Sequence, residues 1–180
     1  MRAKRAAIDI KTREIAAKQA AKLFIHHPLF HTSQHIACYI AGVDEFDCTL
    51  IIEAIWAAGK NCYLPVLTPE KQLEFFSYQR NDKLSPNRYG IPEPHDTQFI
   101  ATAKLDVILA PLVAFDRKGH RLGMGGGYYD RTLAFLLNQS LAQPKFIGLS
   151  YACQEVPALT PDAWDVALQG VITEEDIYVK

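Results

Sequence analysis

The sequence predicts a doubly wound α/β domain with a mostly parallel sheet, and three observations favour this fold class. Apolar stretches of strand length alternate with amphipathic stretches of helix length along the chain. The stretch from Val107 to Phe115 is apolar throughout, which is typical of a central parallel strand covered on both faces. A glycine-rich segment, Gly123 to Gly127, separates this stretch from the next predicted helix. Strand, glycine-rich loop and helix in this order can build an anion-binding site.

Chain length and composition fit one domain that spans residues 1–180. Folding a chain of this size removes roughly 70% of the unfolded surface from water, which is enough for a real hydrophobic core. The formal net charge of −1 argues against a protein that holds nucleic acid by its net charge. No apolar run reaches the roughly 18 residues of a membrane span. The charged N-terminus lacks a hydrophobic signal region, so a cytoplasmic protein without a membrane partner is expected.

Hydrophobic periodicity defines the elements of the first half of the chain. In the first helix, apolar residues recur at intervals of three and four, and Pro28 ends it. Asp47 is the expected N-cap of the second helix, and Gly59 follows its last residue. The expected elements are, in chain order, a helix from Ile8 to His27, a strand from Ile36 to Ala41, a loop from Gly42 to Asp47, a helix from Cys48 to Ala58, a strand from Asn61 to Leu67 and an antiparallel neighbour from Leu73 to Gln79.

The second half contains a long polar segment before the central strand. Because the segment from Arg80 to Thr97 carries three prolines, we expect a mostly irregular loop, and loops of this length are often functional. The remaining expected elements are a short helix from Phe99 to Lys104, the central strand from Val107 to Phe115, a helix from Tyr128 to Asn138, a strand from Lys145 to Tyr151, a loop from Val156 to Trp164, and short extended segments at Val171–Ile172 and Ile177–Val179.

The four cysteines are scattered and show no C-x-x-C spacing. Cys38 and Cys62 fall in predicted strands, so buried free thiols are expected rather than a metal site or disulfides. Four of the six histidines lie between residues 26 and 35, but their spacing does not gather them on one face beside a cysteine or an acid. Zinc binding is therefore not expected there.

The segment from Arg121 to Asp130 reads RLGMGGGYYD and is the strongest candidate for a functional site. Glycines lack a Cβ, so backbone N–H groups can approach an anion closely, and the start of the following helix adds unpaired amides. The segment lacks the Lys-Ser or Lys-Thr pair of a Walker A loop, and Tyr128 stands where a dinucleotide fingerprint needs its third glycine. From the pattern alone, a phosphate cradle with a magnesium ligand and a simple glycine-rich turn before a helix both remain open. In the second case Asp130 is only a first-turn acid favoured by the helix dipole.

The run APLVAFD from Ala110 to Asp116, followed by Gly119 and then by RLGxGxGYYD from Arg121 to Asp130, resembles the signature of the 5-formyltetrahydrofolate cyclo-ligase (5,10-methenyltetrahydrofolate synthetase) family. The resemblance continues in order over nearly the whole chain. It implies a three-layer, doubly wound α/β fold similar to sugar-phosphate isomerase and CoA-transferase domains. It also implies conversion of 5-formyltetrahydrofolate, with or without a polyglutamate tail, to 5,10-methenyltetrahydrofolate, with ATP as co-substrate, Mg²⁺ as cofactor, and ADP and phosphate as products.

The same resemblance implies roles for individual residues. Arg121 and Tyr128 would be catalytic, and Asp130 and Asp165 would bind Mg²⁺. Glu45 would accept paired hydrogen bonds from the pterin ring. The expected nucleotide contacts are Lys4, Arg5, Arg121, Leu122, Gly123, Met124, Gly125, Gly126, Gly127, Tyr128 and Tyr129. The expected folate contacts are Ile40, Glu45, Met124, Gly125, Gly126, Gly127 and Tyr128.

Four further points accompany the resemblance. The basic N-terminal arm that contacts ATP in the family is short here, and a frayed basic terminus at Lys4 and Arg5 is an alternative. Gly126 stands where many members carry Lys, which removes a phosphate-binding cation. Of Tyr128 and Tyr129, one is expected to face the core and the other the substrate. The segment YGIPEP, residues 89–94, resembles a family segment near the active site, or is a proline-stiffened turn.

Two rival functions use the same scaffold. One is a non-catalytic sensor of sugar phosphates, as in transcription regulators. No helix-turn-helix segment is left over for such a role, and a sensor does not need Asp130 and Asp165 around a phosphate. The other is a sugar-phosphate isomerase or acyl-CoA transferase, which needs a catalytic carboxylate but no nucleotide hydrolysis.

Overall fold

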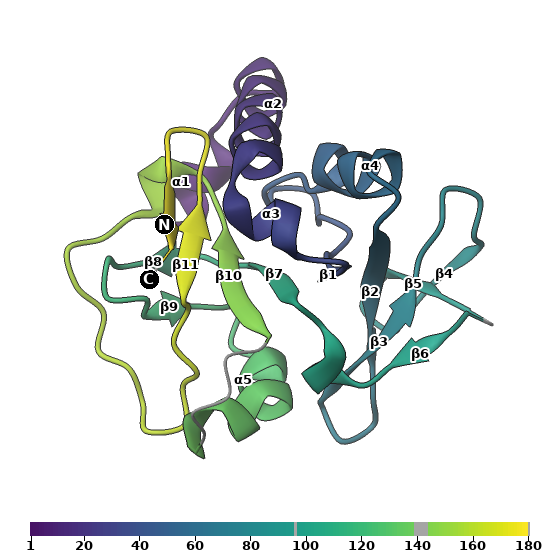
Figure 1. The fold of residues 1–180 in the computed structure, drawn as a ribbon. Helices are drawn as coiled ribbons and strands as arrows, with labels where there is room; N and C mark the ends of the chain where they lie inside the picture. Colours follow the sequence, from purple (N-terminus) through teal and green to yellow (C-terminus); the bar gives the residue numbers. More distant parts are fainter. Residues whose placement is uncertain (96, 139–143, 180) are drawn as a thin grey trace.

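The computed structural model describes residues 1–95, 97–138 and 144–179. Within these residues, one central sheet contains eight strands in the order β12-β11-β10-β7-β1-β2-β3-β6 (Figure 1). The strands are β1 (His35–Ala37), β2 (Asn61–Leu67), β3 (Leu73–Ser77), β6 (Phe99–Ile100), β7 (Val107–Pro111), β10 (Lys145–Leu149), β11 (Gly170–Ile172) and β12 (Ile177–Val179). The run from β11 to β2 is parallel, whereas β12, β3 and β6 are antiparallel additions at the two sides. The prediction of a mostly parallel sheet is confirmed.

Helices cover both faces of the sheet and make three layers. The helices are α1 (Arg2–Ala6), α2 (Ile10–His26), α3 (Pro28–Thr32), α4 (Thr49–Ala57) and α5 (Tyr128–Leu133), with 3₁₀ turns at Thr102–Lys104, Ala134–Asn138 and Ala152–Gln154. Figure 1 shows α2, α3 and α4 on one side of the sheet and α5 on the other. Side chains along the central strand β7 point alternately to the two faces of the sheet. Val107 and Leu109 pack on the side of α2, α3 and α4, whereas Ile108 and Ala110 pack on the side of α5.

Helix α2 begins at Ile10, two residues after the predicted start at Ile8, and ends at His26, one residue before the predicted end. The Asp9 side chain caps it by accepting hydrogen bonds from the amide (3.0 Å) and hydroxyl (2.6 Å) of Thr12. Pro28 ends α2 and becomes the first residue of α3, a position where its missing N–H costs no hydrogen bond. The structure corrects the cap of α4. Cys48 is the N-cap residue, and the Asp47 carboxylate accepts instead from the amide of Thr49 at 2.9 Å.

Two predictions about the middle of the chain were wrong in part. The predicted irregular loop from Arg80 to Thr97, of which residue 96 lies outside the described part, contains a short hairpin of β4 (Leu84–Pro86) and β5 (Pro92–Pro94). The predicted helix from Phe99 to Lys104 is a strand followed by a 3₁₀ turn. Ile100 pairs with Phe75 of β3 and fills the core, so tertiary pairing decides its conformation.

The predicted strand from Val107 to Phe115 is interrupted. Strand β7 ends at Pro111, whose nitrogen cannot donate to a neighbouring strand. The chain then forms a second small hairpin of β8 (Ala114–Phe115) and β9 (Arg121–Leu122), which leads into the glycines. The helix predicted from Tyr128 to Asn138 is α-helical only to Leu133 and continues as a 3₁₀ turn.

The sheet order reverses at the boundary between β1 and β7. From β1 the chain passes through α4 to β2 on one side, and from β7 it passes through α5 to β10 on the other. Because β1 and β7 are parallel neighbours, the segments that follow them leave the sheet at the same edge. Ligands of open α/β sheets bind in the crevice at such a switch point. Among the described residues, no helix is long and apolar enough to span a membrane.

Candidate active site

The buried side chain of Arg5 ties together three segments at this edge of the sheet. Its Nη2 and Nε donate to Oδ2 of Asp44 at 3.0 and 3.3 Å, and its Nη1 donates to the carbonyl of Leu112 at 3.0 Å. Asp44 belongs to the loop after β1, and Leu112 follows β7. Arg5 is only 2% exposed, so the N-terminal arm is a packed helix rather than a frayed end. The predicted contact of Arg5 with ATP stays a prediction, but its guanidinium is engaged with protein groups.

A hollow of about 550 Å³ opens between α1 and the glycine loop. Its apolar wall includes Val113 and Leu122, and its cation is Arg2. The lining residues are Met1, Arg2, Ala3, Val113, Leu122, Gly123, Met124 and Gly125. The structure therefore brings the predicted loop residues beside the N-terminal arm. Sequence reasoning missed Arg2, because no pattern showed that the arm is a helix with Arg5 turned inward.

The glycine loop presents its backbone donors at the surface. Gly125 and Gly127 have φ values of +85° and +64°, a left-handed conformation that favours glycine. Residues 123–126 are exposed. In the described parts of the chain, no protein group accepts a hydrogen bond from the amides of Gly123 to Gly127. The loop has the geometry expected of an anion cradle, in which the backbone N–H groups remain free for a ligand.

Gly126 is matched to the tyrosine two residues later. A Cβ built on Gly126 would lie 2.7 Å from both Cδ2 and Cε2 of Tyr128, closer than real Cβ atoms approach. The Tyr128 ring therefore lies against bare backbone. A lysine at position 126, as the family resemblance leads one to expect, would require this ring to move.

Arg121 and Asp130 form an ion pair behind the loop. Nη2 of Arg121 donates to Oδ1 of Asp130 at 2.7 Å, and Nη1 donates to the carbonyl of Val166. The guanidinium also stacks on Phe146 with 4.6 Å to the ring centre, and the Arg121 side chain is only 6% exposed. Asp130 accepts a second hydrogen bond from the amide of Val166 at 3.1 Å. Arg121 thus fixes Asp130 and the 162–166 segment, and its guanidinium does not project freely towards the loop.

The predicted metal ligands come from neighbouring segments. Asp165 precedes Val166, whose amide bonds to Asp130, and Oδ2 of Asp165 accepts from the amide of Asp162 at 2.9 Å. In the part of the chain that the structure describes, Oδ2 of Asp130 and Oδ1 of Asp165 receive no protein donor. Each aspartate thus keeps a hard oxygen of the kind that Mg²⁺ prefers, and this donor chemistry fits the ion.

Tyr129 is the tyrosine that faces the core. It stacks on Phe146 with 5.7 Å between ring centres, and it is packed among buried residues of the α5 side. Burial raises the pKa of Tyr129 strongly, the Glu45 carboxylate raises it further, and Arg121 opposes this change. Arg5 joins Asp44 of the loop after β1 to Leu112 after β7, so this loop and the segment that leads to the glycine loop lie at the same edge of the sheet.

The predicted folate residues of the first loop lie at that position. Oε2 of Glu45 accepts from the amide of Gly42 at 2.9 Å, which closes a short turn. Ile40 is half-buried against the core on the same loop. The structure thus places Ile40 and Glu45 at the edge where the glycine loop also lies, as the sequence predicted.

Tyr128 contacts the turn that begins the YGIPEP segment, which the resemblance placed near the active site. Its hydroxyl lies 3.0 Å from Nη2 of Arg88 and 2.9 Å from the hydroxyl of Tyr89. Hydrogen bonds from Tyr89 and then from Arg88 lower the pKa of the Tyr128 phenol. Arg88 and Tyr89 lie in the turn between β4 and β5. The available signal was the length of the polar segment and its YGIPEP motif, which falls within it.

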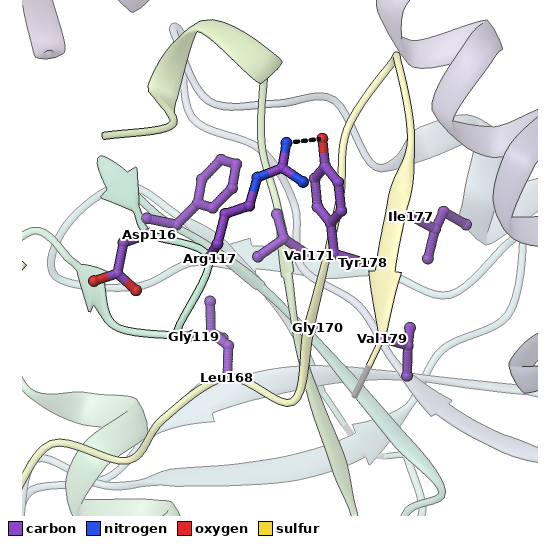
Figure 2. A pocket seen from close by; sticks show the side chains of 10 residues that line it. Asp116, Arg117, Gly119, Leu168, Gly170, Val171, Ile177, Tyr178 and Val179 are labelled. Carbon is purple, nitrogen blue, oxygen red and sulfur yellow. Dashed lines mark hydrogen bonds between the residues drawn. The ribbon is translucent and has the colours of Figure 1, made fainter. Parts of the chain in front are cut away.

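A second hollow, of about 290 Å³, lies between β11–β12 and the turn after β8 (Figure 2). Figure 2 shows the Arg117 guanidinium over the Tyr178 ring, with 4.3 Å to the ring centre. Arg117 also forms two hydrogen bonds to Glu155, at 2.8 and 3.2 Å. The buried Asp116 carboxylate already accepts from the Lys118, His120 and Leu159 amides. Because its main polar groups are engaged with protein, we place the candidate site at the larger hollow beside the glycine loop.

Comparison with known proteins identifies the family of this chain. The sequence model of the 5-formyltetrahydrofolate cyclo-ligase family matches residues 1–174. The 5-formyltetrahydrofolate cyclo-ligase of Escherichia coli K12 is 36% identical over 182 residues, which cover 99% of this chain and 98% of that protein. The enzyme of that name from Haemophilus influenzae is 40% identical over 144 residues, which cover 78% of this chain and 75% of that protein.

Solved structures show the same relationship. The NMR structure of Aquifex aeolicus 5,10-methenyltetrahydrofolate synthetase matches with a TM-score of 0.81 and 27% identity, over 98% of this chain and 87% of that one. A synthetase of the same name from Mycoplasma pneumoniae matches with a TM-score of 0.72 and 25% identity, over 95% and 92%. These relatives are ligases, which decides against the sensor and the isomerase or transferase alternatives. The chain belongs to the 5-formyltetrahydrofolate cyclo-ligase family.

Proposed function

We propose that this ligase converts 5-formyltetrahydrofolate to 5,10-methenyltetrahydrofolate at the expense of ATP, with Mg²⁺ as cofactor, and releases ADP and phosphate. The main support for the proposal is the glycine loop beside the α1 hollow, because in the described part of the chain its glycine amides donate to no protein group. Family membership supplies the folate chemistry. A cytoplasmic location, with small-molecule substrates only, remains part of the proposal.

The chemistry requires activation of a poor leaving group. The formyl oxygen attacks the γ-phosphorus of ATP, the bond to the bridging oxygen of ADP breaks, and the formyl oxygen becomes a phosphate ester. N10 then attacks the formyl carbon and loses its proton, the ring closes, and phosphate departs with the former formyl oxygen. Such a transfer depends on alignment and charge neutralisation more than on a protein nucleophile.

The amides of Gly123 to Gly127 would hold the phosphates, and Arg2 and Lys4 would supply the nearby cations. A hydrogen bond to a charged group contributes roughly 1.5–3 kcal/mol. A micromolar ligand needs about 8 kcal/mol after the costs of association. Several amides therefore need the cations and the apolar wall of the hollow, where Val113 and Leu122 offer a surface for the adenine ring.

Asp130 and Asp165 would hold Mg²⁺ through their remaining carboxylate oxygens. The ion would neutralise charge on the phosphate oxygens as the transfer proceeds. Arg121 has a positioning role in this account, because its ion pair fixes the direction of the Asp130 carboxylate. The folate would occupy the adjoining edge, with its pterin on Glu45, with Ile40 as a wall and with Tyr128 in contact with it.

The experiment is direct. Protein, Mg-ATP and 5-formyltetrahydrofolate are mixed, and the near-ultraviolet absorbance of the methenyl product is followed together with ADP release. We expect product and ADP in equal amounts, with neither formed when one substrate is omitted. Absence of product, together with absence of folate-dependent ADP release, would reject the proposed function.

A further inference from the structure

The turn between β4 and β5 is anchored so that it reaches the glycine loop. Asn87 Oδ1 accepts from the amides of Tyr89 (2.8 Å) and Ile91 (3.1 Å), and its Nδ2 donates to Oε1 of Glu93 at 2.7 Å. Glu93, only 8% exposed, also accepts from the amide of Leu67 in β2 at 2.9 Å. A buried carboxylate thus fastens the turn to the sheet, and the turn holds Arg88 against Tyr128.

Three cations surround Tyr128 without a carboxylate partner. Arg88 bonds to its hydroxyl, Arg131 lies over its ring at 5.6 Å from the centre, and the charge of Lys71 acts on its phenol. Nε of Arg131 donates to the carbonyl of Lys71 at 2.8 Å, which holds the group together. Lys71 has a φ of +60°, the one non-glycine residue of the described chain with a positive φ. Within residues 1–95, 97–138 and 144–179, no Asp or Glu oxygen lies within ion-pair distance of Arg88, Lys71 or Arg131.

The two ends of the glycine loop face different surroundings. Gly123 and Gly125 line the hollow beside α1, whereas Gly126 lies under the Tyr128 ring and its carbonyl accepts from Nη2 of Arg131. If the nucleotide phosphates bind at the α1 end of the glycine loop, Arg88, Arg131 and Lys71 lie next to the folate. A folate carries a glutamate with two carboxylates at the end remote from its pterin. A guanidinium fork matches a carboxylate in a bidentate geometry.

We propose that Arg88, supported by Arg131 and Lys71, binds the glutamate carboxylates of the folate substrate and so acts as a specificity residue. This inference rests on the proposed function. Phosphate oxygens are the other anions that the same cations would accept, and the experiment separates the two sources.

The test compares Arg88→Gln, Arg88→Lys and the control Arg80→Gln. Arg80 is an exposed arginine over the Trp56 ring, so its variant removes one charge at a site with no proposed ligand. KM and kcat are measured for 5-formyltetrahydrofolate, for 5-formyltetrahydropteroate, which lacks the glutamate, and for ATP. Far-ultraviolet circular dichroism and thermal melting check that each variant is folded.

For Arg88→Gln we expect the KM for 5-formyltetrahydrofolate to rise about tenfold, with kcat and the KM for ATP within about twofold of the parent. On 5-formyltetrahydropteroate the variant and the parent should be equal. Arg88→Lys should recover part of the loss, and Arg80→Gln should behave as the parent. If only the KM for ATP rose, the cations would be assigned to phosphate binding. If kcat/KM fell equally for both folates, Arg88 would not bind the glutamate. Either result overturns the inference, whereas a parent enzyme without turnover would reject the proposed function itself.

Discussion

The guanidinium of Arg5 donates to the carboxylate of Asp44 at 3.0 Å and joins the N-terminal helix to the loop after β1. The same group holds the carbonyl of Leu112, which follows β7. Both loops of the candidate site are therefore fixed by one side chain that is far away in the sequence. The relationship gives Arg5 a structural role, and its predicted contact with the nucleotide stays a prediction.

Arg5→Ala should destabilise the protein by about 3 kcal/mol, because it leaves a carbonyl and a carboxylate at the edge of the core without their donor. Urea unfolding measures this change as a lower midpoint. Arg2→Ala is the matched control on the same helix, and we expect it to unfold like the parent. Equal midpoints for Arg5→Ala and the parent would show that the pair does not support the fold.

Arg2→Ala should raise the KM for ATP about tenfold, because one charge-assisted contact in the hollow beside Gly123 is lost. The KM for the folate should stay within about twofold. Steady-state kinetics with each substrate varied in turn checks this expectation. An unchanged KM for ATP would remove Arg2 from the nucleotide site.

Asp130→Asn should lower kcat at least about 100-fold, because a neutral amide is a poor ligand for Mg²⁺. EDTA should abolish the activity of the parent enzyme, and added Mg²⁺ should restore it. The amide oxygen at position 130 can still accept from Arg121 and from the amide of Val166, but the buried guanidinium loses its counter-ion, so the melting temperature should fall. Far-ultraviolet circular dichroism at the assay temperature checks that the variant is folded. Parent-like kcat in this variant would contradict the metal assignment.

Gly126→Ala should reduce kcat/KM in the parent, because the new Cβ would displace the Tyr128 ring from its position 2.7 Å away. In a Tyr128→Ala background the same change should have little effect. A double-mutant cycle on kcat/KM measures the coupling between the two positions. Additive effects would show that the ring does not depend on bare backbone at Gly126.

Asp116 provides a prediction of pH-dependent stability. Burial raises the pKa of its carboxyl, but hydrogen bonds from the Leu159 amide and from His120 outweigh this and lower it below the ordinary value of 3.8. A depressed folded-state pKa contributes stability at pH values above the unfolded-state pKa, and this contribution is lost as the pH falls through the folded-state pKa. Asp116→Asn should therefore lower the free energy of unfolding by about 2 kcal/mol at pH 7 and by progressively less below about pH 4. If the free energies of unfolding of the variant and the parent differed by the same amount from pH 7 to pH 3, this prediction would be contradicted.

Most of the fold followed from local pattern. The apolar run that begins at Val107 predicted a central parallel strand. The glycines after it predicted the loop that lines the hollow beside α1. Predictions failed where tertiary pairing overrode local preference, as at Phe99 and Ile100, which extend β3 instead of forming a helix. Pro111 also breaks the long apolar run, because it cannot continue the strand ladder.

The candidate site was less visible in the sequence. The glycine loop and Asp130 were predicted from the signature, and Glu45 from its place in the family resemblance, and their roles stay predictions. Arg2 and Arg88 were not predicted, because their positions depend on a short helix and a hairpin turn that no periodicity reveals. The direction of the Arg121 guanidinium was also hidden, because its partner Val166 lies 45 positions away along the chain.

The central claim is that the amides of Gly123 to Gly127 grip the phosphates of a nucleotide. The most direct measurement is a ¹⁵N NMR titration with Mg-ADP of a uniformly labelled protein. The account predicts that the largest amide shifts fall on Gly123 to Gly127, with smaller shifts on α1. Largest shifts around Arg117 and Gly119, beside the second hollow, with the glycine loop unmoved, would contradict it.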